Sequence, residues 1–539
     1  PAMINKFPEG LIQFLEQPVS YPHQPESVEH IQTHISHVFI APPYVYKFKK
    51  PVNFDFLDFS TLKKRKYYCE REVDLNSRLC EGPYIGVVPL YKSGATWSFN
   101  KTEGAEPAEY GVHMHQLSGD HFLIEYLNTG NLTGQHLRRV ADKLLPFYKN
   151  QSPGQEILKW GEPDRIKINT DENFEQTKEF IGNTISRYTY ETIQYYTNQF
   201  LNEHRNLFKK RIEEKRIKDG HGDLHLEHIH FSDEDDRVCI YDCIEFNDRF
   251  RYQDIASDIA FLAMDLDFNG QPELSRYFIE QMSDGLNDPD LMKLVDFYRC
   301  YRAYVRGKVK SLESSEEEVG TSGRERAVQL AKDYFSLALQ YVLFGSKPSV
   351  LVFMGRVASG KSTLAEQVAD ELNIQRYSSD ILRKERADQP LQIRTPYQKR
   401  EKLYRKEVSD SIYRDLADLA VHEISEGRSI VLDATFGNPE YRKNLISQIE
   451  NKHAGLYFIE AEAPQEIRLN RLQLREIQAD VISDARAEDL DKIDRFYHSP
   501  GELPPGKRIT ISTNESVGQS LKVLFRGLAN KQIRGIKTE

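Results

Sequence analysis

The sequence predicts two folds in one chain: a two-lobed α+β N-terminal half and an α/β C-terminal half built on a parallel sheet. Three observations support this prediction. Strand-like runs precede a long helical region in the first half, strands and helices alternate in the second, and a polar acidic segment lies between the halves. We expect the division to follow residues 1–115, 116–312, 313–347 and 348–539.

The first expected lobe combines short strands with one charged helix, which follows a helical pattern at residues 61–79. Strand-like runs of apolar and aromatic residues occur at 38–40, 45–48 and 84–91. Helical patterns then dominate to about residue 310, and alternating residues at 238–242 interrupt them. This order predicts a small mixed lobe followed by a larger helical lobe.

The boundary between the halves is a polar stretch at residues 313–323, which is acidic, contains glycine and has almost nothing to bury. It predicts a mobile loop or linker. Residues 324–344 then carry apolar side chains at helical spacing, and a break at 345–348 precedes an apolar run suited to a buried strand at 349–354. We therefore expect the C-terminal domain to begin near Pro348.

A phosphate-binding loop follows that strand. Residues 355–363 fit the pattern G-x-x-x-x-G-K-[ST], and the next residues begin a helix. Glycines let backbone N–H groups approach phosphates, and a helix N-terminus adds favourable potential for an anion. We expect Lys361 to reach the β- and γ-phosphates of ATP and the Ser362 hydroxyl to hold Mg²⁺. The predicted nucleotide-binding residues are Gly355, Ser359, Gly360, Lys361, Ser362 and Thr363.

A second buried strand is expected at residues 429–433, where an apolar run ends in an acid. Ligands bind at the carboxyl ends of the strands in parallel sheets, so Asp433 is predicted to hold Mg²⁺ directly or through water. The alternative is that Asp433 only ends the strand and caps the segment that follows. Further strands are expected at 456–459 and 508–512, which completes the alternation of strands and helices.

Two groups of charged residues are expected near the transferred phosphate. Asp380 and Arg383 are three positions apart, so at the start of a helix they can face one cavity and offer an acceptor hydroxyl a base and a cation. Further along, arginines at positions i, i+3 and i+7 form one basic face that is predicted to close over the nucleotide. These arginines are Arg468, Arg471 and Arg475, and a solvated helix face is the alternative interpretation.

Residues 348–515 resemble the P-loop small-kinase group, which includes gluconate kinases, zeta-type toxins and the kinase domain of phage-type polynucleotide kinase. The likeness rests on the P-loop, residues 379–383, residues 432–442 and the arginine-bearing segment. It implies that Asp380 is the base and that Arg383 contacts the acceptor. It also implies that Arg471 or Arg475 stabilises the transferring phosphoryl group.

The first half contains a second acidic motif. In the run His221-Gly-Asp-Leu-His-Leu-Glu-His228, Asp223 precedes Asp242 by nineteen positions, and Asp242 closes an apolar strand. Phosphoryl transfer needs one carboxylate that orients a hydroxyl and one that holds Mg²⁺, so the two carboxylates must converge. The alternative is a metal site formed by the histidines, although alternating loop positions are poor zinc spacing.

This motif is similar to that of the aminoglycoside phosphotransferase-like kinases, and more closely to a two-part bacterial family that joins such a domain to a P-loop kinase. The likeness rests on residues 34–37, 45–51, 54–60, 72, 242–248, 254–258 and 301–308. It implies a protein-kinase-like, bilobal N-terminal half with Asp223 as the catalytic aspartate and Asp242 as an Mg²⁺ ligand. Lys47 would contact phosphate and pair with Glu72, with Glu70 as the alternative partner.

Two positions depart from that pattern. His228 stands five residues after Asp223, where this group usually has a metal-binding asparagine, and we assign His228 to the metal site although Mg²⁺ prefers oxygen. No glycine-rich nucleotide loop precedes Lys47. The expected consequences are weak nucleotide binding, a single metal ion, or a regulatory pseudokinase.

Composition excludes several other classes of protein. With 39% hydrophobic residues, 30 Gly and 24 Pro, the chain is neither collagen-like nor wholly disordered. No apolar stretch approaches ~18 residues and no signal-peptide core is visible, so we expect a cytoplasmic protein without a membrane partner. The net charge of −10 disfavours a general nucleic-acid coat but allows a local basic site.

The five cysteines are an odd and sparse set, which does not predict a disulfide framework. Cys239 and Cys243 lack a matching second pair, so zinc is disfavoured and buried thiols beside a strand are expected.

The sequence therefore favours an ATP- and Mg²⁺-dependent phosphotransferase with two kinase-like modules, the second acting on a hydroxyl of a small molecule. A second hypothesis makes the acceptor the 5′-hydroxyl of RNA or DNA. The motifs at 380–383 and 438–442 favour it, and the acidic charge disfavours it unless residues 399–405 and the arginine-bearing segment form a basic groove. A third hypothesis is an ATP-hydrolysing switch whose first half only binds a ligand or partner.

Overall fold

The computed structural model describes residues 7–54, 56–101, 105–232, 237–316, 319–477, 482–504 and 506–536. The start of the chain, where no signal-peptide core is expected, and residues 317–318 of the expected acidic linker lie outside these ranges. The chain forms two compact units, which are described separately. The first contains Pro1–Ile166 and Asn206–Val295, and the second contains Lys167–Arg205 and Asp296–Glu539. These units are defined by spatial contacts, and the four-segment division expected from sequence motifs stays a prediction.

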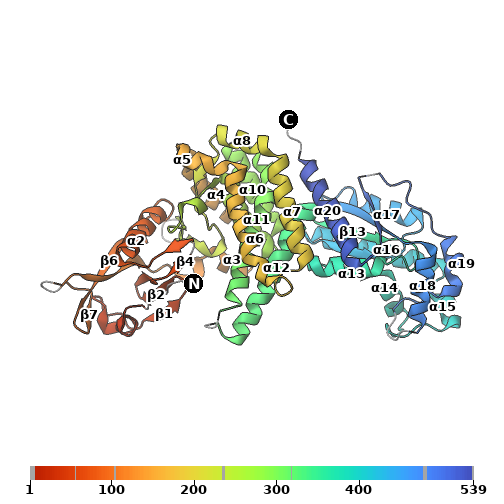
Figure 1. Cartoon of the computed structure of the whole chain (residues 1–539), viewed down its shortest axis with the longest axis horizontal. Helices are drawn as coiled ribbons and strands as arrows, with labels where there is room; N and C mark the ends of the chain where they lie inside the picture. Colours follow the sequence, from red (N-terminus) through yellow and green to blue (C-terminus); the bar gives the residue numbers. More distant parts are fainter. Residues whose placement is uncertain are drawn as a thin grey trace. The chain divides into compact units, whose positions relative to one another are not determined.

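The first unit begins with a six-stranded sheet in the order β1-β2-β3-β8-β6-β7, in which all neighbouring strands are antiparallel. Its strands are β1 (Glu29–Gln32), β2 (Ser36–Ala41), β3 (Tyr44–Lys49), β6 (Tyr84–Ser93), β7 (Thr96–Ser98) and β8 (Pro107–His115). Helix α2 (Leu62–Ser77) packs against β6 and β8 (Figure 1). The Thr61 side chain begins this helix by accepting a hydrogen bond from the Lys64 N–H. The strands and helix expected here are confirmed.

The rest of the first unit is mainly helical. Its longer helices are α3 (Leu123–Asn128), α4 (Gly134–Lys149), α8 (Arg205–Glu213), α9 (Ile255–Phe268) and α10 (Pro272–Leu286). Helix α9 is buried on all sides from Ile255 to Leu266, which makes it the centre of this core. Two short two-stranded antiparallel sheets frame the acidic motif, namely β9 (Ile217–Asp219) with β12 (Tyr252–Asp254) and the hairpin of β10 (Ile229–Phe231) and β11 (Val238–Ile240). The kinase-like bilobal arrangement of this half stays a prediction.

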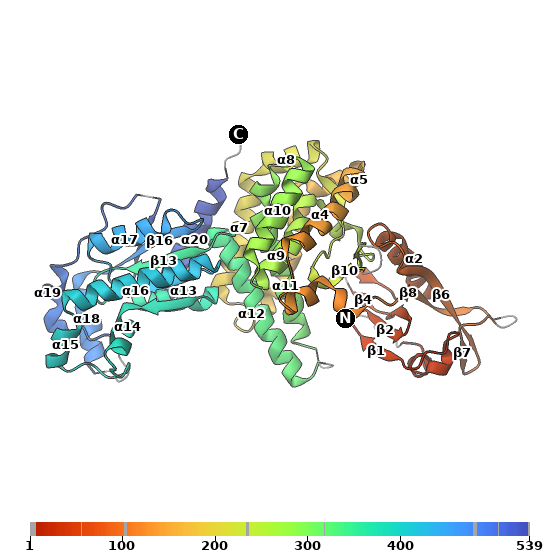
Figure 2. The ribbon, with the colours of Figure 1, turned by 180° about the vertical axis from the view of Figure 1, so that it is seen from behind.

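The second unit contains a five-stranded parallel sheet in the order β14-β15-β13-β16-β17. The strands are β13 (Ser349–Met354), β14 (Gln375–Ser378), β15 (Ile430–Asp433), β16 (Gly455–Glu462) and β17 (Arg508–Ser512). Helices α13 (Lys361–Leu372) and α16 (Lys406–Ser425) run beside β13 (Figure 2). The remaining helices are α14 (Ser379–Arg386), α15 (Tyr397–Leu403), α17 (Pro439–Ile449), α18 (Gln465–Glu476), α19 (Leu490–Asp494) and α20 (Val517–Gly535). The predicted α/β parallel-sheet fold is confirmed. Strand β14 was not expected, because it is a polar edge strand without an apolar run.

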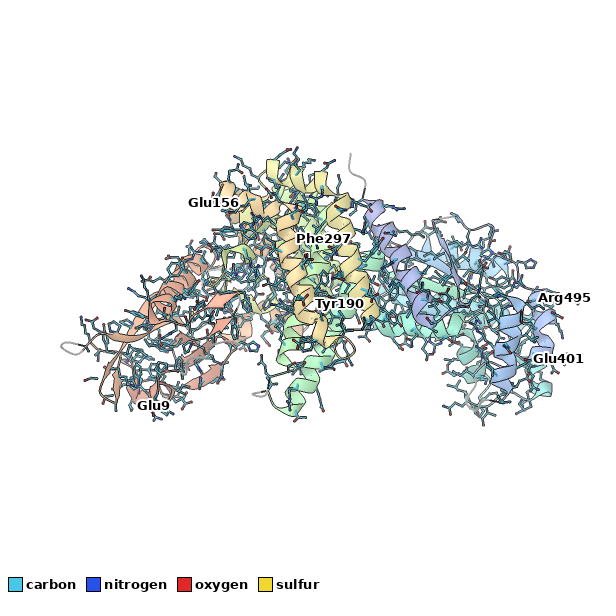
Figure 3. All side chains as sticks on the ribbon, in the orientation of Figure 1. Glu9, Glu156, Tyr190, Phe297, Glu401 and Arg495 are labelled. Carbon is cyan, nitrogen blue, oxygen red and sulfur yellow. A yellow bond between two sulfur atoms is a disulfide. The ribbon has the colours of Figure 1, made fainter. Side chains whose placement is uncertain are left out.

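A helical group belongs to the same unit as this sheet. Its members are α6 (Pro163–Thr177), α7 (Arg187–Glu203), α11 (Leu291–Glu313) and α12 (Thr321–Phe344). The first residues of α6, up to Ile166, and of α11, up to Val295, belong to the first unit. Phe297 on α11 stacks on Phe200 of α7 with ring centroids 4.5 Å apart, and Figure 3 shows Phe297 and Tyr190 among these helices. Helix α12 is the helix expected at residues 324–344, and it packs against α7, α13 and α20.

Cys239 was expected to be a buried thiol, and this prediction is wrong, because Cys239 forms a disulfide with Cys80. The Ile240 N–H donates a hydrogen bond to the Leu79 carbonyl oxygen, so the end of the segment after α2 lies beside β11. A separation of 159 residues hides this contact from any local sequence pattern. Cys69, Cys243 and Cys300 are buried free thiols.

Within the described ranges, none of the helices combines the length and the apolar character needed to cross a bilayer.

Candidate functional site

The P-loop connects β13 to α13 and has backbone geometry that requires glycine at two positions. Gly355 has φ 143°, and a Cβ there would lie 2.5 Å from the Ala461 carbonyl oxygen. Gly360 has φ 90° and immediately precedes the first turn of α13. The hydroxyl of Ser359 is buried and has no hydrogen-bond partner in the described part of the chain. The loop therefore offers backbone N–H groups and an unpaired hydroxyl, which fit a phosphate.

Ser362 and Asp433, the two predicted Mg²⁺ ligands of this domain, are brought together. The Ser362 hydroxyl donates to Asp433 Oδ1 at 3.0 Å, and Arg376 of β14 donates to Oδ2 at 3.1 Å. Burial raises the pKa of the Asp433 carboxyl, and nearby Lys361 acts in the opposite direction. A hydroxyl and a carboxylate form an oxygen-only donor set, which fits Mg²⁺. Arg376 was missed because β14 was missed. Thr363 is exposed in the first turn of α13.

The arginines of α18 lie against the P-loop rather than on an open helix face. Arg471 donates to the carbonyl oxygens of Ala358 at 3.2 Å and Thr513 at 2.5 Å. Arg468 is buried and bonds to Asp494 at 2.6 Å. Burial lowers the pKa of Arg475, as does neighbouring Arg471. Thr513, which sequence reasoning missed, donates its hydroxyl to the Ser359 carbonyl oxygen and follows directly after β17.

Asp380 and Arg383 both lie on α14 but differ in their surroundings. Asp380 is half-buried and acts electrostatically on Asp433 and Arg475, so it faces the P-loop region. Arg383 is buried, donates to the Leu403 carbonyl oxygen at 2.6 Å and lies 4.5 Å from the centroid of the Tyr404 ring. The Arg383 guanidinium thus supports the segment between α15 and α16, and its expected acceptor contact stays a prediction.

The motif from Asn438 to Arg442 supports its own loop. Asn438 caps α17 by accepting a hydrogen bond from the Glu440 N–H. Arg442 is fully buried and donates to the carbonyl oxygens of Phe436 at 2.6 Å and His498 at 3.1 Å. These contacts account for the positions of both side chains without a nucleic-acid ligand.

A cavity of about 450 Å³ opens beside the P-loop at the carboxyl ends of β16 and β17. Its lining includes Arg356, Ser359, Glu460, Pro464, Tyr497 and Asn514. This cavity therefore lies directly beside the P-loop residue Ser359.

In the first unit, Lys47 joins the predicted partners Glu72 and Asp242. Lys47 Nζ lies 3.0 Å from Glu72 Oε1 and 2.7 Å from Asp242 Oδ1. Glu70 is exposed and lies 3.6 Å from Lys66, so Glu72 is the partner of Lys47. Burial raises the pKa of Asp242, but Lys47 and then His228 outweigh burial and hold it well below its ordinary value. Asp242 also has φ 60°, a conformation that costs energy outside glycine.

Lys49 is a second lysine of this site that sequence reasoning missed. It is fully buried and pairs with Glu72 Oε2 at 2.6 Å and with Glu245. Lys47 and Lys49 are two residues apart on β3, so both point to the same face of the sheet. That spacing was the available signal.

The loop that carries Asp223 is held by Asp258 of α9. The buried carboxylate of Asp258 accepts hydrogen bonds from the backbone N–H groups of His221 at 2.6 Å and Gly222 at 2.9 Å. It also accepts one from the Tyr148 hydroxyl at 2.9 Å. Burial lowers the pKa of His221 to about 4, so its ring is neutral at pH 7.

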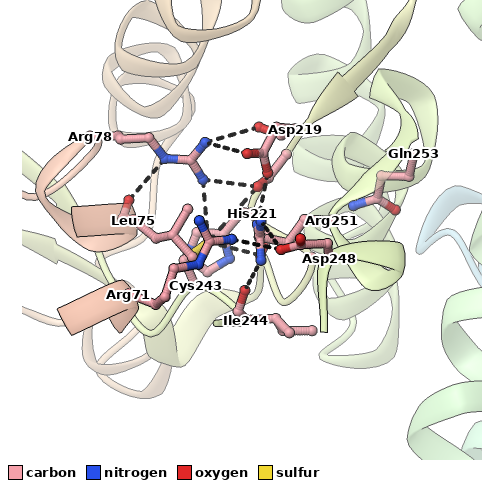
Figure 4. Close-up of polar contacts among 12 residues, drawn as sticks. Arg71, Leu75, Arg78, Asp219, His221, Cys243, Ile244, Asp248, Arg251 and Gln253 are labelled. Carbon is pink, nitrogen blue, oxygen red and sulfur yellow. Dashed lines mark hydrogen bonds and ion pairs between the residues drawn. The ribbon is translucent and has the colours of Figure 1, made fainter. Parts of the chain in front are cut away.

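Helix α2, which carries Glu72, is tied to this loop by a network of ion pairs (Figure 4). Arg78, just after α2, lies 3.3 Å from Asp219, and Arg71 within α2 lies 2.6 Å from Asp248. Arg251 pairs with both of these aspartates at 2.7 Å. The network fixes α2 so that Glu72 stays opposite Lys47.

The donor set around Asp223 and Asp242 does not match the oxygen ligands that Mg²⁺ prefers. His228 Nε2 lies 3.5 Å from Asp242 Oδ2, and His225 Nε2 lies 3.5 Å from Asp223 Oδ2. Burial lowers the pKa of His228, as does His225. Ligand atoms of Asp223, His225 and His228 lie within 4.8 Å of one another, and Asp242 Oδ2 lies beside His228, so the expected Mg²⁺ site contains nitrogen donors.

Comparisons with known proteins cover both halves of the chain. Residues 350–500 match a family model described as "AAA domain". The chain is 30% identical over 457 residues to "Uncharacterized protein Mb2027c" of Mycobacterium bovis and to "Uncharacterized protein Rv2004c" of Mycobacterium tuberculosis. Each match covers 85% of this chain and 87% of the relative.

Two solved structures are similar to part of the chain. A gluconokinase from Sinorhizobium meliloti 1021 is 16% identical with a TM-score of 0.26, over 34% of this chain and 93% of that chain. The Mycobacterium tuberculosis APS kinase CysC, in complex with AMPPNP and APS, is 19% identical with a TM-score of 0.26, over 34% of this chain and 98% of that chain. The C-terminal domain has the P-loop fold that the sequence predicts, and the extent of the mycobacterial matches shows that the chain belongs to the same family as these mycobacterial proteins.

Proposed function

We propose that the C-terminal domain transfers the γ-phosphoryl group of ATP to a hydroxyl of a small molecule. The observation that carries this proposal is the convergence of the P-loop, the Ser362–Asp433 pair, Asp380 and the α18 arginines at one edge of the parallel sheet. Mg²⁺ held by Ser362 and Asp433 would neutralise charge on the β- and γ-phosphates.

The residues of the chain have distinct roles in this proposal. Lys361 and the N-terminal N–H groups of α13 hold the phosphates. Asp380 accepts the proton of the acceptor hydroxyl as the new O–P bond forms and ADP leaves. Arg471 and Arg475 offset the charge of the phosphoryl group in transit. The contact of Arg471 with the Ala358 carbonyl oxygen of the P-loop and the electrostatic interaction of Arg475 with Asp380 and Asp433 support this role.

A small-molecule acceptor is favoured over a polynucleotide by the contacts of the acceptor-side motifs. Asn438 and Arg442 support their own loop, and Arg383 supports the segment after α15. Arg400, within the stretch that was expected to contribute a basic groove, is paired with Asp489 at 2.7 Å. Arg383, Arg400, Asn438 and Arg442 therefore have partners within the protein.

Replacing Asp380 by asparagine tests the proposed base. We expect kcat to fall about 10²–10⁴-fold with little change in ATP affinity, because the variant keeps the shape but cannot take the proton. Transfer of radiolabelled γ-phosphate to metabolite pools and to 5′-hydroxyl oligonucleotides measures both rate and acceptor. The exposed Glu385→Gln on the same helix is the matched control. Unchanged kcat in Asp380→Asn would refute the role of the base, and labelling of oligonucleotides alone would refute the small-molecule acceptor.

We also propose that the first unit binds a nucleotide through Lys47 and Glu72. The observation in favour is that Lys47, Glu72 and Asp242 meet in one ion-pair cluster beside the α2 network. In full-length Lys361→Met protein, in which the P-loop lysine is absent, we expect residual ATP-analogue binding that Lys47→Met abolishes. The assignment is contradicted if the Lys361→Met single variant and the Lys361→Met, Lys47→Met double variant bind the ATP analogue equally well.

A further inference from the structure

Four potential metal ligands lie together around the loop at residues 221–228. One ligand atom each of Asp223, His225 and His228 lie within 4.8 Å of one another. The fourth group is Asp242, whose Oδ2 atom lies 3.5 Å from His228 Nε2. The four side chains come from two segments that the β10–β11 hairpin brings together.

Hydrogen bonding fixes which nitrogen of His228 is available. His228 Nδ1 lies 2.9 Å from the backbone carbonyl oxygen of Asp223, and a carbonyl oxygen can only accept a hydrogen bond. Nδ1 therefore carries a hydrogen, which leaves Nε2 as the ring nitrogen that can bind a metal ion. Metal-binding histidines commonly have this arrangement, in which the other ring nitrogen donates to a carbonyl and orients the ring.

His228 Nε2 faces the Oδ2 atom of Asp242. The separation of 3.5 Å from Asp242 Oδ2 is too long for a good hydrogen bond. Two ligand atoms that bind one ion at about 2.1 Å with a tetrahedral angle lie about 3.4 Å apart. The spacing therefore suits two ligands of a common cation.

The neighbouring histidines have other roles. His221 Nε2 donates to the Tyr241 carbonyl oxygen at 2.9 Å, and His221 Nδ1 accepts from the Asp223 N–H at 3.3 Å. His230 Nε2 lies 3.1 Å from the Ser118 carbonyl oxygen, to which it donates. Of the four histidines in this motif, these two are structural, and His225 and His228 face the carboxylates.

The two lysines near the cluster leave one carboxylate oxygen of Asp242 available to a cation. Lys47 is paired with Glu72 and with Asp242 Oδ1, and Lys49 is paired with Glu72 and Glu245. Asp242 Oδ2 is directed to His228 instead. The side chains of Asp223 and Asp242 are 33% and 38% exposed, whereas that of His225 is 4% exposed, so an ion can reach the cluster from the carboxylate side.

We propose that Asp223, His225, His228 and Asp242 bind a first-row transition-metal dication in preference to Mg²⁺. Imidazole nitrogen binds ions such as Co²⁺ and Zn²⁺ well, whereas Mg²⁺ requires oxygen ligands in octahedral geometry. The proposal does not depend on the reaction of the P-loop domain, and it holds whether or not the first unit transfers phosphate.

Titration of Co²⁺ into untagged, chelator-treated full-length protein without nucleotide tests the proposal. We expect one equivalent of Co²⁺ to bind with a visible ligand-field spectrum and to raise the melting temperature. Zn²⁺ should displace Co²⁺ at equal concentration, and Mg²⁺ should fail to displace it at a 100-fold excess. His228→Ala should weaken Co²⁺ binding by at least about 10–100-fold, because even the loss of an outer-shell partner typically costs that much. His225→Ala provides a second test if His228→Ala does not fold.

Three comparisons make the result specific to this cluster. His230→Gln changes a neighbouring histidine that is bonded to Ser118, and it should leave Co²⁺ affinity unchanged. Asp433→Asn in the P-loop domain should also leave it unchanged. His228→Asn replaces the imidazole by an oxygen donor, so it should weaken Co²⁺ and strengthen Mg²⁺ binding. The proposal is overturned if both His225→Ala and His228→Ala bind Co²⁺ as the unaltered protein does, or if Mg²⁺ displaces Co²⁺ at comparable concentration.

Discussion

Lys361→Met is expected to lower the rate of phosphoryl transfer by the C-terminal domain about 10²–10³-fold. Lys361 is the first residue of α13, directly after the left-handed Gly360, where its ammonium group can reach the β- and γ-phosphates. Methionine keeps a similar length and apolar stem but removes the charge, so the loop can fold while the stabilisation of the transition state is lost. Single-turnover transfer from radiolabelled ATP measures the change directly.

Two controls separate loss of charge from loss of structure. Lys347→Met changes an exposed lysine just before β13 and should leave the rate unchanged. The melting temperature of Lys361→Met should stay within a few degrees of the unaltered protein, because surface and half-exposed substitutions usually change stability by less than about 0.5 kcal/mol. A rate within about threefold of the original would remove Lys361 from the mechanism, since the loss of a charge-stabilising group costs far more.

Asp258→Ala is expected to lower the free energy of unfolding of the first unit by about 3–5 kcal/mol. The carboxylate is completely buried and accepts hydrogen bonds from the backbone of His221 and Gly222 and from the side chains of Tyr148 and Gln253. Alanine leaves these donors without their partner, and buried donors without a partner cost more than the net value of the bonds. Differential scanning calorimetry of the full-length protein measures the loss as an earlier transition.

The same substitution should also loosen the loop that carries Asp223. Co²⁺ binding at the proposed metal site should therefore weaken in Asp258→Ala, although Asp258 is not a ligand. Asp258→Asn retains one acceptor oxygen and should have a smaller effect on both measurements. Asp142→Asn on the exposed side of α4 is the matched control and should change stability by less than about 0.5 kcal/mol. A melting profile of Asp258→Ala that matches this control would show that the carboxylate does not hold the loop.

The acceptor-side residues show which features a sequence motif predicts and which contacts it does not. The spacing of Asp380 and Arg383 places both on α14, as expected. It does not indicate that the Arg383 guanidinium lies on Tyr404 and donates to Leu403, because those residues are about twenty positions away, at and just after the end of α15. Arg442 is similar: its place in a motif favoured a polynucleotide acceptor, whereas its burial and its hydrogen bonds to Phe436 and His498 show that it supports the loop.

The sequence by itself determined the features whose causes are local. The strand, loop and helix from Ser349 to Leu372 follow from an apolar run, two glycines in positions that disfavour a side chain, and helical periodicity, all within a few turns of chain. The acidic residues at the ends of β11 and β15 could be identified for the same reason.

Only the tertiary structure decided which distant residues meet. Lys47 and Asp242 are 195 residues apart, and the disulfide of Cys80 and Cys239 joins residues 159 apart. The convergence of His225 and His228 with Asp242 depends in the same way on the β10–β11 hairpin. Periodicity and backbone preference act over a few residues, whereas contacts between distant segments depend on which buried faces come together in the folded core. The local motifs therefore indicate phosphate chemistry, and the long-range contacts decide which ligands each site can hold.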